Sequence, residues 1–243
     1  MIRFRNFSAG YGEELWGPSH LDFEVSKVYS IIGPNGIGKS TFLKCISQVK
    51  TDYSGKIEII NIENKWNDLK DLSSEQLGNL VSWMPTYLDL SHWKVKDFLM
   101  TNYQGKFSFY DRLKPEDEKS LNDISEFLEI ESILNQSIET LSDGQKQRVM
   151  LAKCLGENSK IVLLDEPVSF IDLPHKYDFM KKLKTLKNKC VIYSSHDIQL
   201  SLKFSDYIIF MYNKELYKLT PKEFMGNKFV REWLGESMEN INF

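Results

Sequence analysis

Apolar residues fall into two kinds of run along the chain, and the first kind predicts strands. Residues 28–32 (VYSII), 160–167 (KIVLLDEP) and 189–197 (KCVIYSSHD) are continuous apolar stretches followed by glycine or polar residues. Such runs are typical of strands buried on both faces of a parallel sheet. Residues 56–62 (KIEIINI) alternate between apolar and polar positions, as a strand does. Residues 207–219 have the pattern of a hairpin that turns at Asn213 and Lys214.

The second kind of run has helical spacing. Residues 40–49 (STFLKCISQV) place four apolar side chains on one face, namely Phe42, Leu43, Ile46 and Val49. Residues 115–130 open with a proline and acids, as the N-terminus of a helix prefers. This segment carries one apolar stripe, formed by Leu121, Ile124 and Leu128. Strands and helices therefore alternate around a long polar middle, which predicts an α/β core interrupted by a helical segment.

Composition excludes several classes of protein. The chain has 243 residues, 42% of them apolar, and its net charge of −3 from 31 basic and 34 acidic residues argues against a nucleic-acid partner. No stretch reaches the roughly 18 apolar residues that span a bilayer, and the start, MIRFRNFSAG, lacks the features of a signal peptide. Cys45, Cys154 and Cys190 lie far apart without a CxxC motif. We expect reduced cytoplasmic thiols in packed positions, with a metal site as the alternative.

GPNGIGKST, residues 33–41, follows the first predicted buried strand directly. It matches G-x-x-x-x-G-K-[ST], in which backbone N–H groups cradle phosphate oxygens and the next helix points its positive end at them. Lys39 adds charge for the β- and γ-phosphates, Ser40 offers a hydroxyl to Mg²⁺, and Thr41 reaches an α-phosphate. The strand before and the helix after speak against a chance glycine-rich turn. The predicted nucleotide-binding residues are Gly33, Pro34, Asn35, Gly36, Ile37, Gly38, Lys39, Ser40 and Thr41.

Polar residues end the two later buried strands. Asp165 and Glu166 follow one strand, and His196 follows the next. Ligands bind at this edge of open α/β sheets. We predict that Asp165 holds Mg²⁺ through water, that Glu166 acts as the general base or orients the attacking water, and that His196 contacts the γ-phosphate. Exposed loop acids and a structural histidine are the alternatives, and the neighbouring phosphate-binding loop speaks against them.

Residues 141–155 (LSDGQKQRVMLAKCL) narrow the choice among nucleotide-binding proteins. They resemble the LSGGQ signature of ABC ATPases, and the order of the other motifs matches that family over almost the whole chain. The resemblance implies a P-loop NTPase core with a mainly parallel sheet, an N-terminal antiparallel β part and an inserted helical subdomain. It implies one domain, 1–243, with a core lobe of 1–86 and 156–243 and a helical subdomain of about 87–155.

The same resemblance assigns further site residues. Tyr11 looks like the aromatic residue that stacks on adenine, with a packing tyrosine as the alternative. The signature residues would close over the γ-phosphate bound by the opposite subunit, and these are Ser142, Asp143, Gly144 and Gln145. A mere helix cap is the alternative role for this segment. Asp172 resembles the residue of the loop that links the two sites. The implied assembly is a head-to-tail homodimer with two ATP molecules and Mg²⁺.

Three positions depart from the family pattern. Asp143 stands where glycine is usual, and its carboxylate would lie near a phosphate-binding loop unless it turns outward. Thr86 stands at the position of the Q-loop glutamine, so a contact to Mg²⁺ would be lost or would run through water. Ile171 replaces the usual leucine before Asp172. Since none of these changes removes a predicted catalytic residue, we still expect ATP hydrolysis.

Several segments resemble one branch of the family, the ATPases of importers for ferric siderophores, haem and cobalamin. These are DLPHK at 172–176, the segment 194–211 and the segment 112–130. The resemblance implies an ATP-hydrolysing subunit, peripheral on the inner face of the cell membrane, that powers import of an iron complex or cobalamin. Its partners would be permease subunits and, indirectly, a substrate-binding protein. The groove that meets the permease would be lined by residues near 86–106. Its aromatic residues are Trp83, Tyr87, Trp93, Phe98, Tyr103 and Phe107. We expect about half of these six side chains to be buried within the subunit.

Other functions stay open at this point. One is a soluble ABC ATPase of iron–sulphur cluster assembly, against which the branch-like segments speak. Another is the ATPase of an exporter, although such chains often carry their own membrane segment. A third is a degenerate ATPase that binds nucleotide and barely turns it over, which Thr86 and Asp143 allow and Glu166 argues against.

Overall fold

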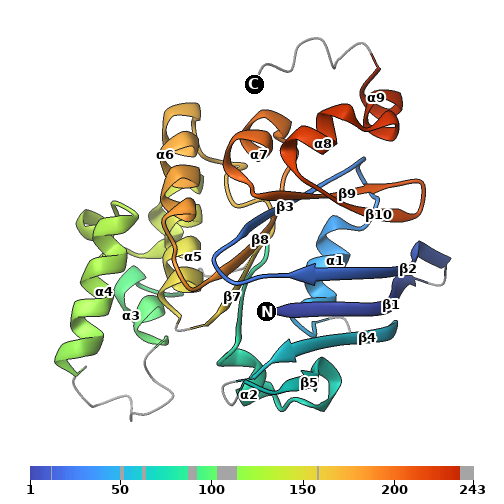
Figure 1. Cartoon of the computed structure of the whole chain (residues 1–243). Helices are drawn as coiled ribbons and strands as arrows, with labels where there is room; N and C mark the ends of the chain where they lie inside the picture. The colour runs from blue at the N-terminus through green and yellow to red at the C-terminus, as the bar shows by residue number, and fades with distance from the viewer. Residues whose placement is uncertain are drawn as a thin grey trace.

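The computed structural model describes residues 1–11, 13–49, 52–61, 64–86, 92–102, 114–157 and 159–235, with backbone alone for Tyr11 and Glu13. Within these ranges, no helix has both the length and the apolar character needed to cross a membrane. The chain folds into two sheets with helices around them (Figure 1).

The first sheet is antiparallel and has the order β2-β1-β4-β5. Its strands are β1 (Ile2–Tyr11), β2 (Glu13–Phe23), β4 (Tyr53–Ile60) and β5 (Trp66–Asp68). The second sheet has the order β10-β9-β3-β8-β7-β6, in which β10 is antiparallel to β9 and all other neighbours are parallel. Its strands are β3 (Val28–Ile32), β6 (Val81–Met84), β7 (Ile161–Leu164), β8 (Cys190–Ser194), β9 (Tyr207–Tyr212) and β10 (Glu215–Leu219). The predicted mainly parallel sheet and N-terminal antiparallel part are thus confirmed.

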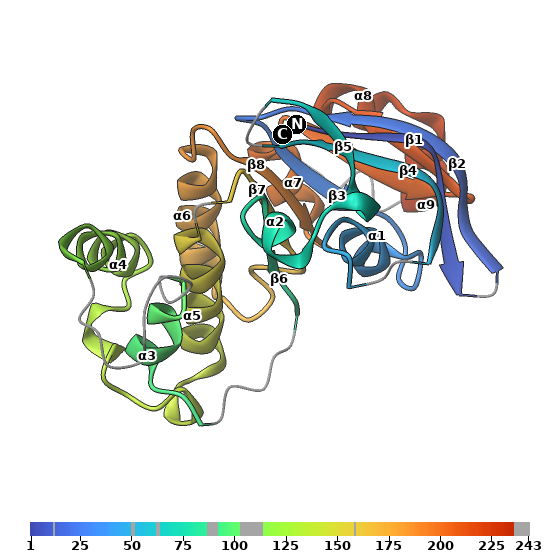
Figure 2. The same ribbon diagram turned by 90° about the horizontal axis from the view of Figure 1, so that it is seen from below.

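The helices are distributed on both sides of the parallel sheet. They are α1 (Lys39–Ile46), α2 (Ser74–Gly78), α3 (Val95–Met100), α4 (Pro115–Phe127), α5 (Asp143–Gly156), α6 (Leu173–Lys184), α7 (Ile198–Phe204), α8 (Pro221–Gly226) and α9 (Lys228–Leu234). Short 3-10 turns lie at Leu69–Asp71, Glu131–Ile133 and Ile138–Thr140. Helices α3 and α4 lie beside α5, at the end of the molecule opposite the antiparallel sheet (Figure 2).

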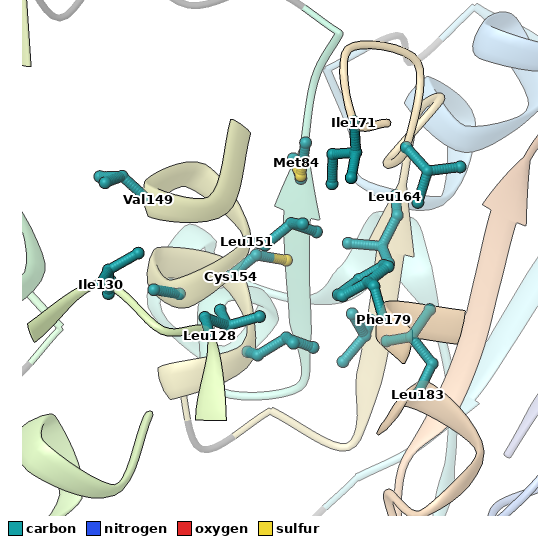
Figure 3. Close-up of a cluster of buried hydrophobic side chains, with 14 of the residues drawn as sticks. Met84, Leu128, Ile130, Val149, Leu151, Cys154, Leu164, Ile171, Phe179 and Leu183 are labelled. Carbon is teal, nitrogen blue, oxygen red and sulfur yellow. The ribbon is translucent and has the colours of Figure 1, made fainter. Parts of the chain in front are cut away.

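The parallel sheet separates two hydrophobic cores, because successive side chains of a strand point to opposite faces. Val162 and Leu164 of β7 face the core formed with α3, α4, α5 and α6. Ile161 and Leu163 of the same strand face the core formed with α1 and the antiparallel sheet. Every residue of β3, β7 and β8 is buried, as the continuous apolar runs predict. Figure 3 shows the first core, where Leu151 and Cys154 of α5 point toward β6 and β7.

One of the predicted elements differs in detail, and another is confirmed. The first helix ends at Ile46, and Val49 lies beyond it with 65% of its surface exposed. Phe42, Leu43 and Ile46 are buried as predicted, but the prediction that Val49 shares their face is wrong. The chain at Gln48 has φ +55, which carries it off the helical path. The hairpin at Asn213 and Lys214 is confirmed, and both residues have positive φ values of 48 and 59. Two such residues match a type I′ hairpin turn.

Cys45, Cys154 and Cys190 are buried free thiols, as expected for packed positions. Among the described residues, no group of three or more histidine, cysteine, aspartate or glutamate side chains is placed to hold a metal ion. Cys154 packs in the core beside α5, and Cys45 and Cys190 pack in the core beside α1.

Candidate functional site

The phosphate-binding loop joins β3 to α1 and depends on two glycines. A Cβ atom on Gly33 would lie 2.4 Å from the carbonyl oxygen of Met211. Gly38 has φ +105, and a Cβ atom there would lie 2.2 Å from Cζ3 of Trp16. The loop therefore packs against β9 and β2 at distances that only glycine permits. Of the remaining residues, Pro34 and Ile37 are partly buried, whereas Asn35 and Gly36 are exposed.

Lys39 lies inside this loop at the start of α1. Its Nζ donates hydrogen bonds to the carbonyl oxygens of Gly33 (2.9 Å) and Pro34 (3.1 Å). Burial lowers the pKa of Lys39, and the carboxylates of Glu166 and Asp165 oppose that shift. A buried cation facing two carboxylates and a cradle of backbone groups fits a polyphosphate ligand. Thr41, on the same turn of α1, is also buried.

Asp165 joins the loop to the two neighbouring strands. It follows β7, is 4% exposed, and its Oδ1 accepts hydrogen bonds from Ser40 Oγ (3.0 Å) and Ser194 Oγ (2.6 Å). Strands β3, β8 and β7 are adjacent in the sheet, so their carboxyl ends bring these three side chains together. A hydroxyl and a carboxylate side by side are oxygen donors of the kind Mg²⁺ prefers. The residues present therefore fit the predicted metal.

Glu166 is held next to His196 at the same edge. Glu166 Oε1 lies 2.6 Å from His196 Nε2, which is a hydrogen bond when Nε2 carries the proton. Ser169 Oγ donates to Oε2 of the same carboxylate (2.9 Å). Side-chain exposure is 28% for Glu166 and 49% for His196, so both reach solvent beside the loop. The arrangement therefore brings a carboxylate and an imidazole into contact at the edge of the sheet that carries the phosphate-binding loop.

The backbone of Glu166 adopts an uncommon conformation. Its φ is +50, in the left-handed region that non-glycine residues rarely occupy. Its N–H donates to Ser194 Oγ (2.9 Å), and its carbonyl oxygen accepts from Gln147 Nε2 (2.9 Å). These contacts hold the peptide groups on both sides of Glu166, and such strain gathers at functional sites.

The signature segment forms the first turn of α5. Ser142 is the N-cap, its Oγ accepts from the Gln145 N–H (3.3 Å), and Gln145 Oε1 accepts from the Ser142 N–H (2.9 Å). This capping box means that the helix-cap role is real in this structure. Ser142 and Asp143 are nevertheless exposed, and Asp143 in the first turn suits the positive end of the helix. A Cβ atom on Gly144 would lie 3.2 Å from the carbonyl oxygen of Phe170.

The remaining predicted residues lie around this centre. Thr86 follows β6 and is exposed. Asp172 is the exposed N-cap of α6, and its Oδ1 lies 2.6 Å from Nδ1 of His175. The side chain of Tyr11 lies outside the described part of the structure, although its backbone pairs with Glu13. Among the predicted groove aromatics, Phe98 is buried, Trp83 is partly buried and Trp93 is 36% exposed, whereas Tyr87, Tyr103 and Phe107 lie outside the described residues.

Three residues that contact the site were not predicted, namely Gln147, Ser169 and Ser194. Ser194 and Ser169 are short polar residues with no motif of their own. Gln147 carried a signal, because it stands in the apolar stripe of α5 with Leu151, Cys154 and Leu155. A polar amide in such a stripe implies buried hydrogen-bond partners.

Comparison with known proteins identifies the family. Residues 17–169 match the ABC transporter family. The chain is 30% identical over 241 residues to the petrobactin import ATP-binding protein of Bacillus subtilis, covering 96% of this chain and 91% of that protein. It is 32% identical over 224 residues to the molybdate/tungstate import ATP-binding protein of Methanocaldococcus jannaschii, covering 89% of this chain and 71% of that protein.

A solved structure points the same way. The dimeric structure of a bacterial ABC transporter cassette superposes with a TM-score of 0.75 at 25% identity, covering 91% of this chain and 99% of that chain. The fold and the site define a P-loop ATPase with a signature helix. The chain belongs to the ABC transporter family, as one of its ATP-binding subunits, and its reaction is ATP hydrolysis.

Proposed function

We propose that this chain powers a membrane importer. It acts as a homodimer at the inner face of the cell membrane and binds no nucleic acid. One observation supports this function most. Lys39, the Ser40–Asp165 pair and the Glu166–His196 pair lie together at the carboxyl ends of β3, β8 and β7. We divide the chain into a core lobe of 1–86 and 156–243 and a helical subdomain of about 87–155. The helical subdomain would carry the permease contacts.

Each site residue has a proposed task. Lys39 and the backbone N–H groups of residues 33–38 bind the β- and γ-phosphates of ATP. Ser40 would hold Mg²⁺ directly and Asp165 would hold it through water, and the ion, when bound, neutralises phosphate charge. Glu166 polarises the attacking water, and His196 orients that water against the γ-phosphate. Tyr11 stacks on the adenine ring.

The second half of the proposed site comes from the partner subunit. Ser142, Asp143, Gly144 and Gln145 at the N-terminus of α5 would face the γ-phosphate bound by the other copy, where the helix dipole favours negative charge. Asp172 would lie between the two sites. Because ATP binds the closed dimer more tightly than the open one, its binding closes the dimer and pulls on the permease. Hydrolysis reopens it.

The proposed cargo is an iron complex or cobalamin, delivered by a substrate-binding protein. The relative that imports petrobactin and the branch-like segments at 172–176 and 194–211 support this cargo. The relative that imports molybdate or tungstate shows that similar cassettes serve other cargo. The identity of the permease partner is therefore needed to identify the cargo.

The experiment captures that permease. Tagged Glu166→Gln is expressed in the native host, membranes are solubilised gently with ATP present, and the proteins that co-purify are identified. We expect a multi-span permease, and we expect its recovery to fall when Lys39→Ala is added as the matched control. Recovery of soluble cluster-assembly proteins, with nothing from the membrane, would contradict the importer and favour a soluble ABC ATPase of iron–sulphur cluster assembly.

A second measurement tests the cargo. Host cells lacking this chain should lose uptake of a labelled ferric siderophore, haem or cobalamin and keep uptake of labelled molybdate and zinc. Loss of molybdate uptake alone would contradict the proposed cargo and leave the importer function in place.

A further inference from the structure

We propose that Gln147 is a positioning residue that couples the signature helix α5 to Glu166 of the same subunit, and through it links the two ATP sites of the dimer. This inference rests on the proposed function, because it needs a partner's nucleotide at the signature. Gln147 touches neither predicted phosphate ligand nor metal ligand. Its effect would run through the loop of residues 166–170.

The side-chain amide of Gln147 bridges both ends of that loop. Its Nε2 donates to the carbonyl oxygen of Glu166 (2.9 Å), and its Oε1 accepts from the N–H of Phe170 (3.0 Å). Gln147 is 6% exposed, so both bonds are shielded from water. One side-chain amide therefore holds both Glu166 and Phe170, which are the two ends of the loop that leads toward Asp172.

The bridge acts on a backbone that needs support. Glu166 has φ +50, a conformation that persists only where surrounding contacts over-determine it. Ser194 Oγ holds the Glu166 N–H from β8, and Gln147 holds the Glu166 carbonyl oxygen from α5. With the α5 contact removed, the peptide planes around Glu166 gain freedom. The carboxylate would then leave its position against the attacking water more often.

The bridge also connects Glu166 to the signature. Ser142 begins α5, and Gln147 lies about 7.5 Å further along the helix axis. Helix α5 meets the loop directly, because a Cβ atom on Gly144 would lie 3.2 Å from the Phe170 carbonyl oxygen. A helix of this length moves as a stiff body. Contact of Ser142 and Gly144 with the partner's nucleotide would therefore reach Glu166 through Gln147.

A purely structural role is the competing explanation. Gln147 lies in a stripe with Leu151, Cys154 and Leu155, where an apolar side chain would pack without needing partners. An amide there costs free energy unless both its groups are bonded, so its presence points to a task beyond packing. Loop stability and catalysis have to be separated by measurement.

The test compares Gln147→Met, which keeps the shape and loses both hydrogen bonds, with Gln147→Glu, which keeps the acceptor for Phe170 and loses the donor to Glu166. Gln136→Met, at an exposed position, is the matched control. ATP Kd, KM, kcat, the Hill coefficient of ATP hydrolysis and the melting temperature are measured for the full chain. We expect an unchanged Kd, kcat lower by about 10- to 100-fold, and a Hill coefficient that falls to unity.

Two results would overturn the coupling. One is a parental kcat and Hill coefficient in both Gln147 variants. The other is a lower melting temperature with unchanged kcat, which is the signature of a structural role. Should Gln147→Met fail to fold, Gln147→Glu decides alone. A parent chain that hydrolyses no ATP contradicts the proposed function as well, whereas a hydrolysing parent matched by its variants contradicts the coupling only.

Discussion

Gly38 closes the phosphate-binding loop in a conformation and a space that exclude other residues. Its φ is +105, and an added Cβ atom would lie 2.2 Å from Trp16 and 2.8 Å from Leu15. We expect Gly38→Ala to lower the free energy of unfolding by at least about 1–2 kcal/mol, because of the left-handed backbone alone. It should also weaken ATP binding, since the loop must shift. Chemical denaturation and an ATP titration measure the two effects.

Gly78→Ala is the matched control for that substitution. No heavy atom lies within 4 Å of a Cβ atom at Gly78, which ends α2. The change should alter stability by no more than about 1 kcal/mol. Equal effects of the two substitutions would show that the contact with Trp16 does not constrain the loop.

At the residue scale, the motif residues could be predicted and their supports could not. Lys39 and Ser40 follow from the loop motif that begins α1, and Asp165 follows from its place after a buried strand. The structure joins Ser40 to Asp165 by a hydrogen bond and directs Lys39 into the loop. Ser194 and Gln147 contact Glu166 from 28 and 19 residues away in the sequence. Such contacts depend on how strands and helices pack, which no short pattern encodes.

Helix α1 anchors the phosphate-binding loop through Phe42. This side chain is fully buried, and its ring centroid lies 5.1 Å from that of Phe4 and 5.8 Å from that of Phe7. We expect Phe42→Ala to lower the free energy of unfolding by about 3–5 kcal/mol, because it leaves a cavity between the two sheets. Guanidinium denaturation measures it. Val49→Ala, at a position 65% exposed, should stay within about 0.5 kcal/mol of the parent, and a comparable loss there would contradict the packing described.

Helix α4 is tied to α6 by Glu129, which follows it with φ +56. Glu129 accepts a hydrogen bond from Lys182 (2.9 Å) and lies 3.9 Å from Arg148. The hydrogen bond from Lys182 lowers the pKa of Glu129. A lowered pKa in the folded state means that the contribution to stability is complete above the unfolded pKa and is lost as the pH falls through the folded one.

A double-mutant cycle of Glu129→Gln and Lys182→Met tests this pair. At neutral pH the coupling energy should be favourable and at most about 1 kcal/mol, because the pair is partly exposed and solvent screens it. It should shrink when the pH is brought well below 4.5, the ordinary pKa of glutamate. A coupling energy independent of pH would contradict the ionic origin of the contact.

At the element scale, turn chemistry and burial were read correctly where the pattern is local. The hairpin at Asn213 and Lys214 and the helix that begins at Pro115 follow from residues that favour those conformations. The end of α1 could not be predicted, because Val49 continues the apolar spacing and only the turn at Gln48 interrupts the helix.

At the scale of the whole molecule, the adjacency of β3, β8 and β7 decides the chemistry. Their order in the sheet gathers the loop, the Ser40–Asp165 pair and the Glu166–His196 pair at one edge. The family pattern predicted this arrangement because the order of motifs along the chain is tied to the order of strands. The surface that would meet a permease was harder to predict, since its aromatic residues serve both the core and the exterior, as Phe98 and Trp93 show.

We propose above all that Glu166 drives hydrolysis of ATP held at the phosphate-binding loop. The most direct measurement follows turnover and molecular mass together for Glu166→Gln with ATP and Mg²⁺, with Lys39→Ala as the variant that should not bind. We predict that Glu166→Gln binds ATP, has a kcat lower than the parent's by about 100-fold or more, and accumulates as a dimer. Turnover at the parental rate, or a monomer with ATP bound, would contradict it.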